Sequence, residues 1–370
     1  YFYTVVYGCL EWDARQYVNG FNIYQYDLNL DSHNIFREGY LFMGLPGERS
    51  TAQPERDFYI HIMPPFGGSS AYTHNLDDEV YFYFRGNDEF KNDLRLYAAA
   101  NAQADISEGK DKDAYLGKAA TLKKKLVKYL SENKNTCFNV TYKCYMRQLI
   151  EVLKGKYNRD MTFKDTIDMA SSICLDEYFG TIYPGYPVMK TKITRKNQAE
   201  NVRAAFDYFA GRKNQQAIAM LQSFGILDGD KIRPEGSMYA SFYIEKLKKL
   251  QPQGVLNYSD LFDEEITFDG HIDFIDKQFK ISYIFTPIIF LPLVYAGYAV
   301  ITLKDGSILT ASNLDNIPRI SVSALYEFRY LSRPAQLSMA ELKKLFEVLD
   351  INPALLDNPN DREKGVAELL

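Results

Sequence analysis

The spacing of hydrophobic residues indicates β-strands in the first part of the chain. Up to residue 86, clusters of Tyr, Phe and Val are broken by Gly and Pro, which is typical of strands and turns. The clearest strand is predicted within 57–66 (DFYIHIMPPF). There Phe58, Ile60 and Ile62 share one face, and two prolines then end the hydrogen-bonded ladder. A second strand is predicted within 77–86 (DDEVYFYFRG).

Between residues 88 and 224 the hydrophobic period becomes that of helices. In 113–130 (DAYLGKAATLKKKLVKYL) the apolar positions recur at helical spacing and lie on one face: Tyr115, Ala119, Leu122, Leu126 and Tyr129. The loop 179–198 divides this region into two helical blocks.

Helix ends are also marked in this region. Thr162 with Asp165, and Asn197 with Glu200, stand where an N-cap and its return partner belong. Gly225 follows an apolar-periodic segment, as the glycine that ends a helix does.

Beyond Gly225 the pattern mixes short elements. A turn with extended arms is predicted at 226–234, a helix at 237–250, and a short strand leading into a short helix at 254–262. Two closing helices are predicted at 321–334 and 338–350, the second with the capping pair Ser338 and Glu341. The whole pattern predicts a helix-dominated α+β protein in four parts: a strand-rich part (1–86), a helical domain (87–225), a winged-helix-like module (226–320) and C-terminal helices (321–370).

An uncharged apolar run covers residues 281–303, between Lys280 and Lys304, and by length alone suggests a membrane span. Its two prolines and its one glycine divide it. Thr286 as N-cap, Pro287 at the first helical position and Gly297 as the stop predict a helix about 15 Å long, half of a bilayer core. The β-branched residues after it and the turn sequence KDGS predict a hairpin. A buried helix and a hairpin are therefore expected, and no membrane anchor.

The order helix, short strand, short helix, apolar helix and hairpin is that of a winged helix-turn-helix module. Such modules often place a recognition helix in the major groove, where polar and basic side chains reach the bases. Here the helix in that position, 287–297 (PIIFLPLVYAG), contains no Arg, Lys, Asn or Gln. We therefore expect this helix to be buried rather than to read DNA.

Composition and charge limit the function classes. The 370 residues are 46% hydrophobic and 25% charged, which is ordinary for a globular protein. The formal net charge of −5 argues against coating nucleic acid or acidic membrane by bulk charge. The four cysteines form no C-x-x-C pair, so neither a zinc site nor a disulfide framework is indicated, and reduced thiols in a cytoplasmic protein are expected. The chain opens without Met or a basic leader, and we expect it to be part of a longer protein.

No motif assigns a catalytic, cofactor-binding or metal-binding residue. The segment 44–50 (GLPGERS) has neither the spacing nor the lysine of a phosphate-binding loop, and the four histidines are isolated. The acidic clusters 77–79 (DDE) and 263–265 (DEE) are expected in solvated turns. Such ungrouped acidic residues are the only support for an autonomous hydrolase, which is therefore the least favoured of the functions considered.

Two basic stretches are candidates for nucleic-acid binding, because clustered cations neutralise phosphates without reading sequence. One lies on the predicted helix 115–130 and the other in the predicted loop 190–196. Their residues are Lys123, Lys124, Lys125 and Lys128, and Lys190, Lys192, Arg195 and Lys196.

Several phrases taken together resemble one family. They are 39–66 (GYLFMGLPGERSTAQPERDFYIHIMPPF), 77–84 (DDEVYFYF), 210–240 (AGRKNQQAIAMLQSFGILDGDKIRPEGSMYA), 254–261 (GVLNYSDL) and 293–306 (LVYAGYAVITLKDG). This combination is similar to the region beyond the nucleotide-binding part of the large P-loop ATPases of bacterial phage defence, the BrxC/PglY type of the BREX and phage-growth-limitation systems.

The resemblance implies a cytoplasmic bacterial protein that works with other phage-defence subunits. It implies ATP and Mg²⁺ only for an upstream domain, to which 1–86 would be a remnant or adjunct, and no cofactor for this segment. On that basis we expect a non-catalytic scaffold and coupling segment. The alternative is a nucleic-acid-binding module of the same machinery, with DNA as a possible partner of loop 190–196 and helix 115–130.

Overall fold

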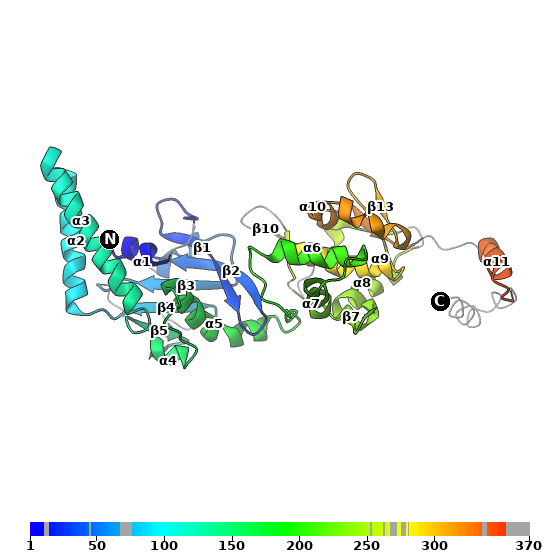
Figure 1. Cartoon of the computed structure of the whole chain (residues 1–370), viewed down its shortest axis with the longest axis horizontal. Helices are drawn as coiled ribbons and strands as arrows, with labels where there is room; N and C mark the ends of the chain where they lie inside the picture. Colours follow the sequence, from blue (N-terminus) through cyan, green and yellow to red (C-terminus); the bar gives the residue numbers. More distant parts are fainter. Residues whose placement is uncertain are drawn as a thin grey trace.

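A computed structural model describes residues 1–10, 15–43, 46–66, 76–251, 254–261, 263–266, 272–274, 279, 281–334 and 339–352. We call residues 1–182 the N-terminal half and 198–334 the C-terminal half. Each half has its own large hydrophobic core, and the linker 183–197 joins them. In Figure 1 the two halves lie side by side along the long axis of the molecule.

A mixed six-stranded sheet forms the centre of the N-terminal half. Its strands are β1 (Ile23–Leu30), β2 (Ile35–Phe42), β3 (Phe58–Met63), β4 (Glu79–Phe84), β5 (Phe138–Tyr142) and β6 (Tyr145–Gln148), in that spatial order. The β2–β3 and β3–β4 pairs are parallel and the others are antiparallel. The predicted alternation in β3 is confirmed, because Phe58, Ile60 and Ile62 all belong to the core on one face of the sheet.

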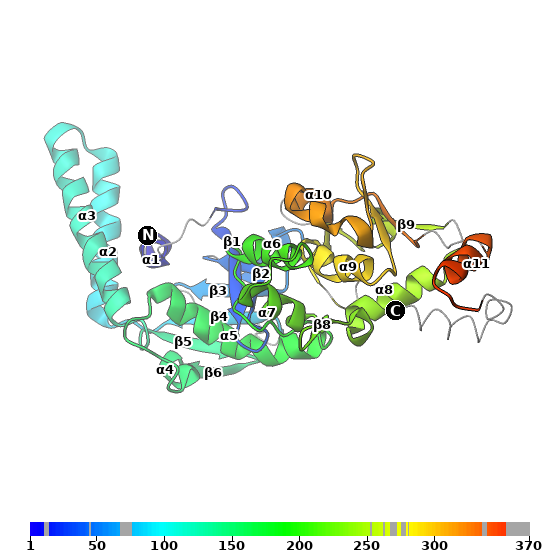
Figure 2. The same cartoon turned by 45° about the vertical axis from the view of Figure 1, so that its right-hand side comes forward.

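Helices cover that face. They are α1 (Phe2–Leu10), α2 (Asp88–Ile106), α3 (Gly109–Glu132), α4 (Leu149–Leu153) and α5 (Phe163–Ile182). Both views show α2 and α3 as an antiparallel hairpin that projects from the end of the molecule (Figures 1 and 2). On the other face, a smaller core of Ile23, Tyr40, Phe42, Ala52 and Tyr59 packs beneath the 3-10 helix η1 (Pro46–Thr51) and the chain that follows it.

The C-terminal half is a helical cluster with short strands. Its elements are α6 (Gln198–Phe209), α7 (Gln215–Ser223), β7 (Leu227–Asp228), β8 (Lys231–Ile232), η2 (Pro234–Gly236), α8 (Met238–Lys248), β9 (Val255–Asn257), η3 (Tyr258–Asp260), β10 (Asp263–Ile266), β11 (Ile272–Phe274), η4 (Tyr283–Phe285), α9 (Thr286–Tyr295), β12 (Val300–Thr302), β13 (Ile308–Leu309), η5 (Ala311–Arg319), α10 (Val322–Tyr326) and β14 (Tyr330–Ser332), followed by α11 (Met339–Val348). Four of the strands form one sheet in the order β13-β12-β14-β9.

The apolar run forms a buried helix and a hairpin, as predicted, but the N-cap is Phe285 and not Thr286, whose hydroxyl donates to Tyr283 O instead. Helix α9 contains Pro287 and Pro292, every residue from Thr286 to Val294 is buried, and the β12–β13 hairpin follows. The helix packs against α6, α8 and α10 in the C-terminal core. Within the described residues, the model contains no helix whose length and hydropathy would let it cross a bilayer.

The α+β fold class is confirmed, while several local predictions are refined or wrong. Thr162 and Asp165 form the predicted reciprocal cap, but the Asn197 side chain instead accepts a bond from the Thr194 N–H. The predicted helix 321–334 is wrong: only α10 is helical, and β14 follows because it fills the place between β12 and β9. Ser338 lies outside the described residues.

Residues 87–225, predicted as one helical domain, are divided between the two cores. Helices α2 to α5 pack with the N-terminal sheet, whereas α6 and α7 pack with α8 and α9. The prediction that 77–79 is a solvated turn is wrong for Glu79, the first residue of β4, whereas Asp77 and Asp78 lie in a turn. Asp78 and Glu79 pair with Arg49 of η1, with 2.8 Å between the guanidinium and Asp78, and Glu79 is buried.

Candidate functional site

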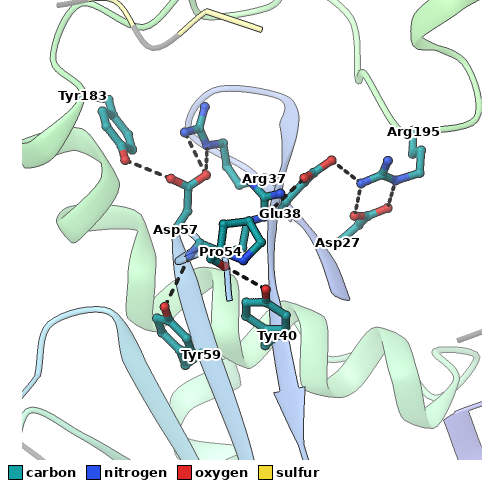
Figure 3. A network of polar contacts seen from close by, with 10 residues as sticks. Asp27, Arg37, Glu38, Tyr40, Pro54, Asp57, Tyr59, Tyr183 and Arg195 are labelled. Carbon is teal, nitrogen blue, oxygen red and sulfur yellow. Dashed lines mark hydrogen bonds and ion pairs between the residues drawn. The ribbon is translucent and has the colours of Figure 1, made fainter. Parts of the chain in front are cut away.

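The place where the linker meets the N-terminal sheet carries a dense set of polar contacts (Figure 3). We call this set the junction: Asp27, Arg37, Glu38, Asp57, Tyr183, Tyr186 and Arg195. They come from β1, β2, the segment before β3, and the linker.

Arg37 is the buried centre of the junction, with 7% of its side chain exposed. Its Nε and a terminal nitrogen each lie 2.8 Å from Oδ2 of Asp57. The Tyr183 hydroxyl donates to the other carboxylate oxygen at 2.9 Å. The guanidinium carbon also lies 4.7 Å and 4.8 Å from the ring centres of Tyr183 and Tyr186, within the range of cation–π attraction. One cation of β2 thus holds the start of the linker.

Burial and neighbouring charges shift the pKa values of Arg37 and Tyr183 further from neutral pH. Burial alone would lower the pKa of Arg37, but the Asp57 carboxylate together with Tyr186 and Tyr183 raises it above its ordinary value. Burial, followed by the charge of Asp57, raises the pKa of Tyr183. Near neutral pH, Arg37 is therefore charged and Tyr183 is a hydrogen-bond donor.

Arg195 makes a second attachment, at the far end of the linker. Its Nε lies 2.7 Å from Asp27 Oδ2 and a terminal nitrogen lies 2.9 Å from Asp27 Oδ1, a bidentate pair. The same terminal nitrogen also contacts Glu38. Asp27 and Glu38 are directly opposite each other on β1 and β2. Because like charges at opposed positions repel, Arg195 relieves an unfavourable pair in the sheet.

The linker backbone is bound to the turn before β2 and to the start of β2. The N–H of Met189 donates to His33 O at 3.0 Å, and the N–H of Ile193 donates to Asn34 O at 2.7 Å. In return the N–H of Phe36 donates to Ile193 O at 3.1 Å, as part of a parallel bridge between Ile35 and Ile193. Ile35 is itself part of the C-terminal core. The first residues of β2 thus belong to both halves.

Together these contacts attach the linker to the N-terminal sheet. The junction fixes the linker at both ends and along its backbone, and the linker runs directly into α6. The linker therefore enters the C-terminal half from a position that the N-terminal sheet holds.

The four basic residues of the predicted loop 190–196 lie on this linker, but they differ in their ion pairs. Arg195 is committed to the junction. Lys190, Lys192 and Lys196 are exposed, and they form no ion pair with any residue that the structure describes.

The predicted helix cations lie on α3, away from the linker (Figure 1). Lys125 bridges α3 to α2 through Asp93 and Glu89, at 2.7 Å and 2.9 Å, and Lys128 pairs with Glu132 within α3. Lys123 is half-buried and Lys124 is exposed. The two basic stretches therefore do not form one surface.

Within the described ranges, the structure has no group of three or more His, Cys, Asp or Glu side chains that could hold a metal ion. Of the junction residues, only Arg195 was singled out from the sequence, and there as a candidate for nucleic-acid binding. The available signal was a charged pair, Arg37-Glu38, inside an otherwise apolar strand (IFREGYLF), which indicates buried partners.

Comparison with known families matches two models. One, described as "DUF6079 third domain", covers residues 1–183, and the other, "Family of unknown function (DUF6079) 4th domain", covers 198–333. The interval between them, 184–197, lies within the linker. Searches of curated proteins and of solved structures gave no match. The chain belongs to the DUF6079 family, and it contains the third and fourth domains of that family.

Proposed function

We propose that this chain is a non-catalytic scaffold and coupling segment of an ATP-dependent phage-defence protein in the bacterial cytoplasm. ATP and Mg²⁺ belong to an upstream domain in this proposal, and the partners are other subunits of the defence system. The phage-defence context rests on the resemblance of five sequence phrases to BrxC/PglY-type ATPases.

The junction is the observation that carries the coupling role. A linker that only joins two domains does not need a defined conformation, and such flexible linkers are typically rich in Gly and Ser. This linker is instead held by a buried cation, a bidentate ion pair and three backbone hydrogen bonds. Such an attachment supports the transfer of a conformational change from one domain to the next.

An affinity experiment tests this proposal. The tagged chain, expressed in a strain that carries a complete defence system, should retain a known subunit of that system, and the purified chain should not hydrolyse ATP above background. Robust hydrolysis by the purified chain would contradict the proposal, as would failure to retain any subunit of the system.

The second candidate function is nucleic-acid binding by the linker. It is favoured by the three exposed lysines, Lys190, Lys192 and Lys196, that lack ion pairs among the described residues. If all three contact phosphates, the logarithm of the affinity for duplex DNA should fall with the logarithm of the salt concentration with a slope of about −2.7.

The matching test compares K190A/K192A/K196A with a control, K249A, which removes an exposed lysine from the end of α8. The triple variant should lose most of the salt-dependent binding and the control should keep it. No shift of duplex DNA at low salt would exclude this function.

A further inference from the structure

Helices α6 and α7 are connected as in a helix-turn-helix unit. They pack against each other, and the turn 210–214 between them contains Gly211 with a φ of 84°. The antiparallel β7–β8 hairpin comes next in the chain, in the place of the wing of winged forms. In such units the second helix lies in the major groove of DNA. Helix α7, unlike the buried helix α9, therefore has both the position of a recognition helix and a face that solvent reaches.

The open face of α7 has the size and chemistry that a groove requires. The residues of α7 that pack into the C-terminal core are Ala217, Met220 and Leu221. The opposite face carries Gln215, Ala219 and Gln222 at helical spacing, and both glutamines are exposed. The helix contains no charged residue that could repel phosphate. Glutamine amides bond to adenine in the major groove, which is about 12 Å wide and admits a helix about 10–12 Å across.

Lysines lie at both ends of α7 and on the hairpin that follows it. Lys213 comes just before the N-cap Asn214. Lys190 of the linker lies at the other end, where its backbone N–H donates to the Ser223 hydroxyl oxygen at 2.8 Å. Lys231 is on β8. All three lysines are exposed, and none forms an ion pair with a residue that the structure describes. We call α7, the β7–β8 hairpin, Lys213 and Lys190 the α7 surface.

The acidic side chains beside α7 are mostly paired. Asp207 at the end of α6 contacts two arginines, at 3.0 Å and 3.5 Å, and Asp228 on β7 pairs with Arg233 at 3.0 Å. Asp230, at the tip of the hairpin, is exposed and has no ion pair among the described residues. The three lysines and Asp230 together give the α7 surface a net charge of 3 − 1 = +2 from side chains that no described partner neutralises. The excess is positive, as a phosphate-facing surface requires.

We propose that α7 is a recognition helix that enters the major groove of B-form duplex DNA. Gln215 and Gln222 face the base edges, and Lys213 and Lys190 contact phosphates on either side of the groove. This inference rests on the second candidate function, DNA binding by the linker, and adds the helix that lies in the groove. Binding by the linker lysines alone would need only a line of phosphates and no groove of a particular width.

That difference gives a test on the unaltered whole chain. Fluorescein-labelled DNA and RNA duplexes of the same sequence carry the same backbone charge, but the major groove of A-form RNA is too deep and narrow for a helix to read. Anisotropy at low salt should therefore show binding of the DNA duplex at least tenfold tighter than binding of the RNA duplex. Equal affinity for the two duplexes would overturn the proposal for α7 and leave binding by the linker lysines in place.

A substitution on the open face of α7 gives the second test. Ala219→Glu puts a carboxylate at the centre of that face and should weaken DNA binding about tenfold, because it repels phosphate. Ala219→Gln has the same length without the charge and should weaken binding much less. Ala99→Glu makes the same change at an exposed position of α2, away from α7 (Figure 1), and should bind as the parent chain does. Circular dichroism checks that each variant is folded.

The outcomes separate this proposal from the function on which it rests. If DNA binding is lost in K190A/K192A/K196A but unchanged in Ala219→Glu, the linker binds DNA and the proposal for α7 is wrong. If the parent chain does not bind the DNA duplex at low salt, both are wrong. If Ala99→Glu weakens binding as much as Ala219→Glu does, net charge and not the face of α7 is responsible, which also overturns the proposal.

Discussion

Replacing Asp57 with alanine is the sharpest perturbation of the junction. The change leaves the Arg37 guanidinium without its carboxylate in a place where only 7% of that side chain is exposed, and it removes the acceptor of the Tyr183 hydroxyl. Removing one partner of a buried ion pair costs about 3–5 kcal/mol. Because 15% of the Asp57 side chain is exposed, water can reach the Arg37 guanidinium after the substitution. We therefore expect the free energy of unfolding to fall by about 3 kcal/mol, at the low end of that range.

The matched control is Asp31→Ala. Asp31 is paired with Lys156 at 3.4 Å, and their side chains are 46% and 53% exposed. Exposed pairs contribute about 0–1 kcal/mol, so this variant should be nearly as stable as the parent chain. The double variant Arg37→Met/Asp57→Ala removes the unpaired charge as well. It should recover most of the lost stability, because apolar replacement of both partners is often nearly neutral.

Urea unfolding followed by circular dichroism measures these differences, with hydrogen exchange of N-terminal amides as the second probe in case the two halves unfold separately. The reasoning is refuted if Asp57→Ala costs no more than Asp31→Ala. It is equally refuted if the double variant is less stable than Asp57→Ala, since the guanidinium would then not be the source of the loss.

Three further predictions follow from the packing. Ile288→Lys places a charge in the fully buried helix α9 and should unfold the C-terminal half, seen as loss of protection from proteolysis; a folded variant that had lost DNA affinity would contradict the buried role of α9. Gly39→Ala should destabilise the chain by about 2 kcal/mol in urea unfolding, because the new Cβ would lie 2.5 Å from both the ring and the carbonyl oxygen of Phe58; an unchanged midpoint would contradict it. One thiol, that of Cys144, should react with Ellman's reagent in the native chain, and all four should react after denaturation, because the other three are buried. Burial raises the pKa of Cys174 to about 11, although Arg147 acts to lower it. At pH 8 about one Cys174 thiol in a thousand is therefore a thiolate, the form that reacts. Rapid native reaction of more than one thiol would show that a core opens readily.

Elements defined by local chemistry could be predicted from the sequence. Helix α9 begins and ends close to the predicted residues because Pro287 and Gly297 act on their own neighbourhood, and its burial follows from the absence of any charged side chain. The alternation in β3 is local in the same way.

Contacts between distant residues could not be predicted. Asp57 lies 20 residues from Arg37 and 126 from Tyr183, so neither periodicity nor a motif places the three together. The same reason explains the error at 321–334. The segment 321–334 was predicted as one helix, but pairing of Tyr330–Ser332 with β9 and β12, from other parts of the chain, makes these residues a strand.

The rigidity of the junction is the central claim, and a distance measurement between the halves tests it most directly. Nitroxide labels at Thr181 on α5 and Gln222 on α7, both exposed, would be placed in a Cys144→Ser background. Pulsed electron resonance should give one narrow distance distribution in this chain and a broad one after Asp57→Ala with Arg195→Ala. A broad distribution before those substitutions, or a narrow one that they leave unchanged, would contradict the claim that the junction couples the two halves.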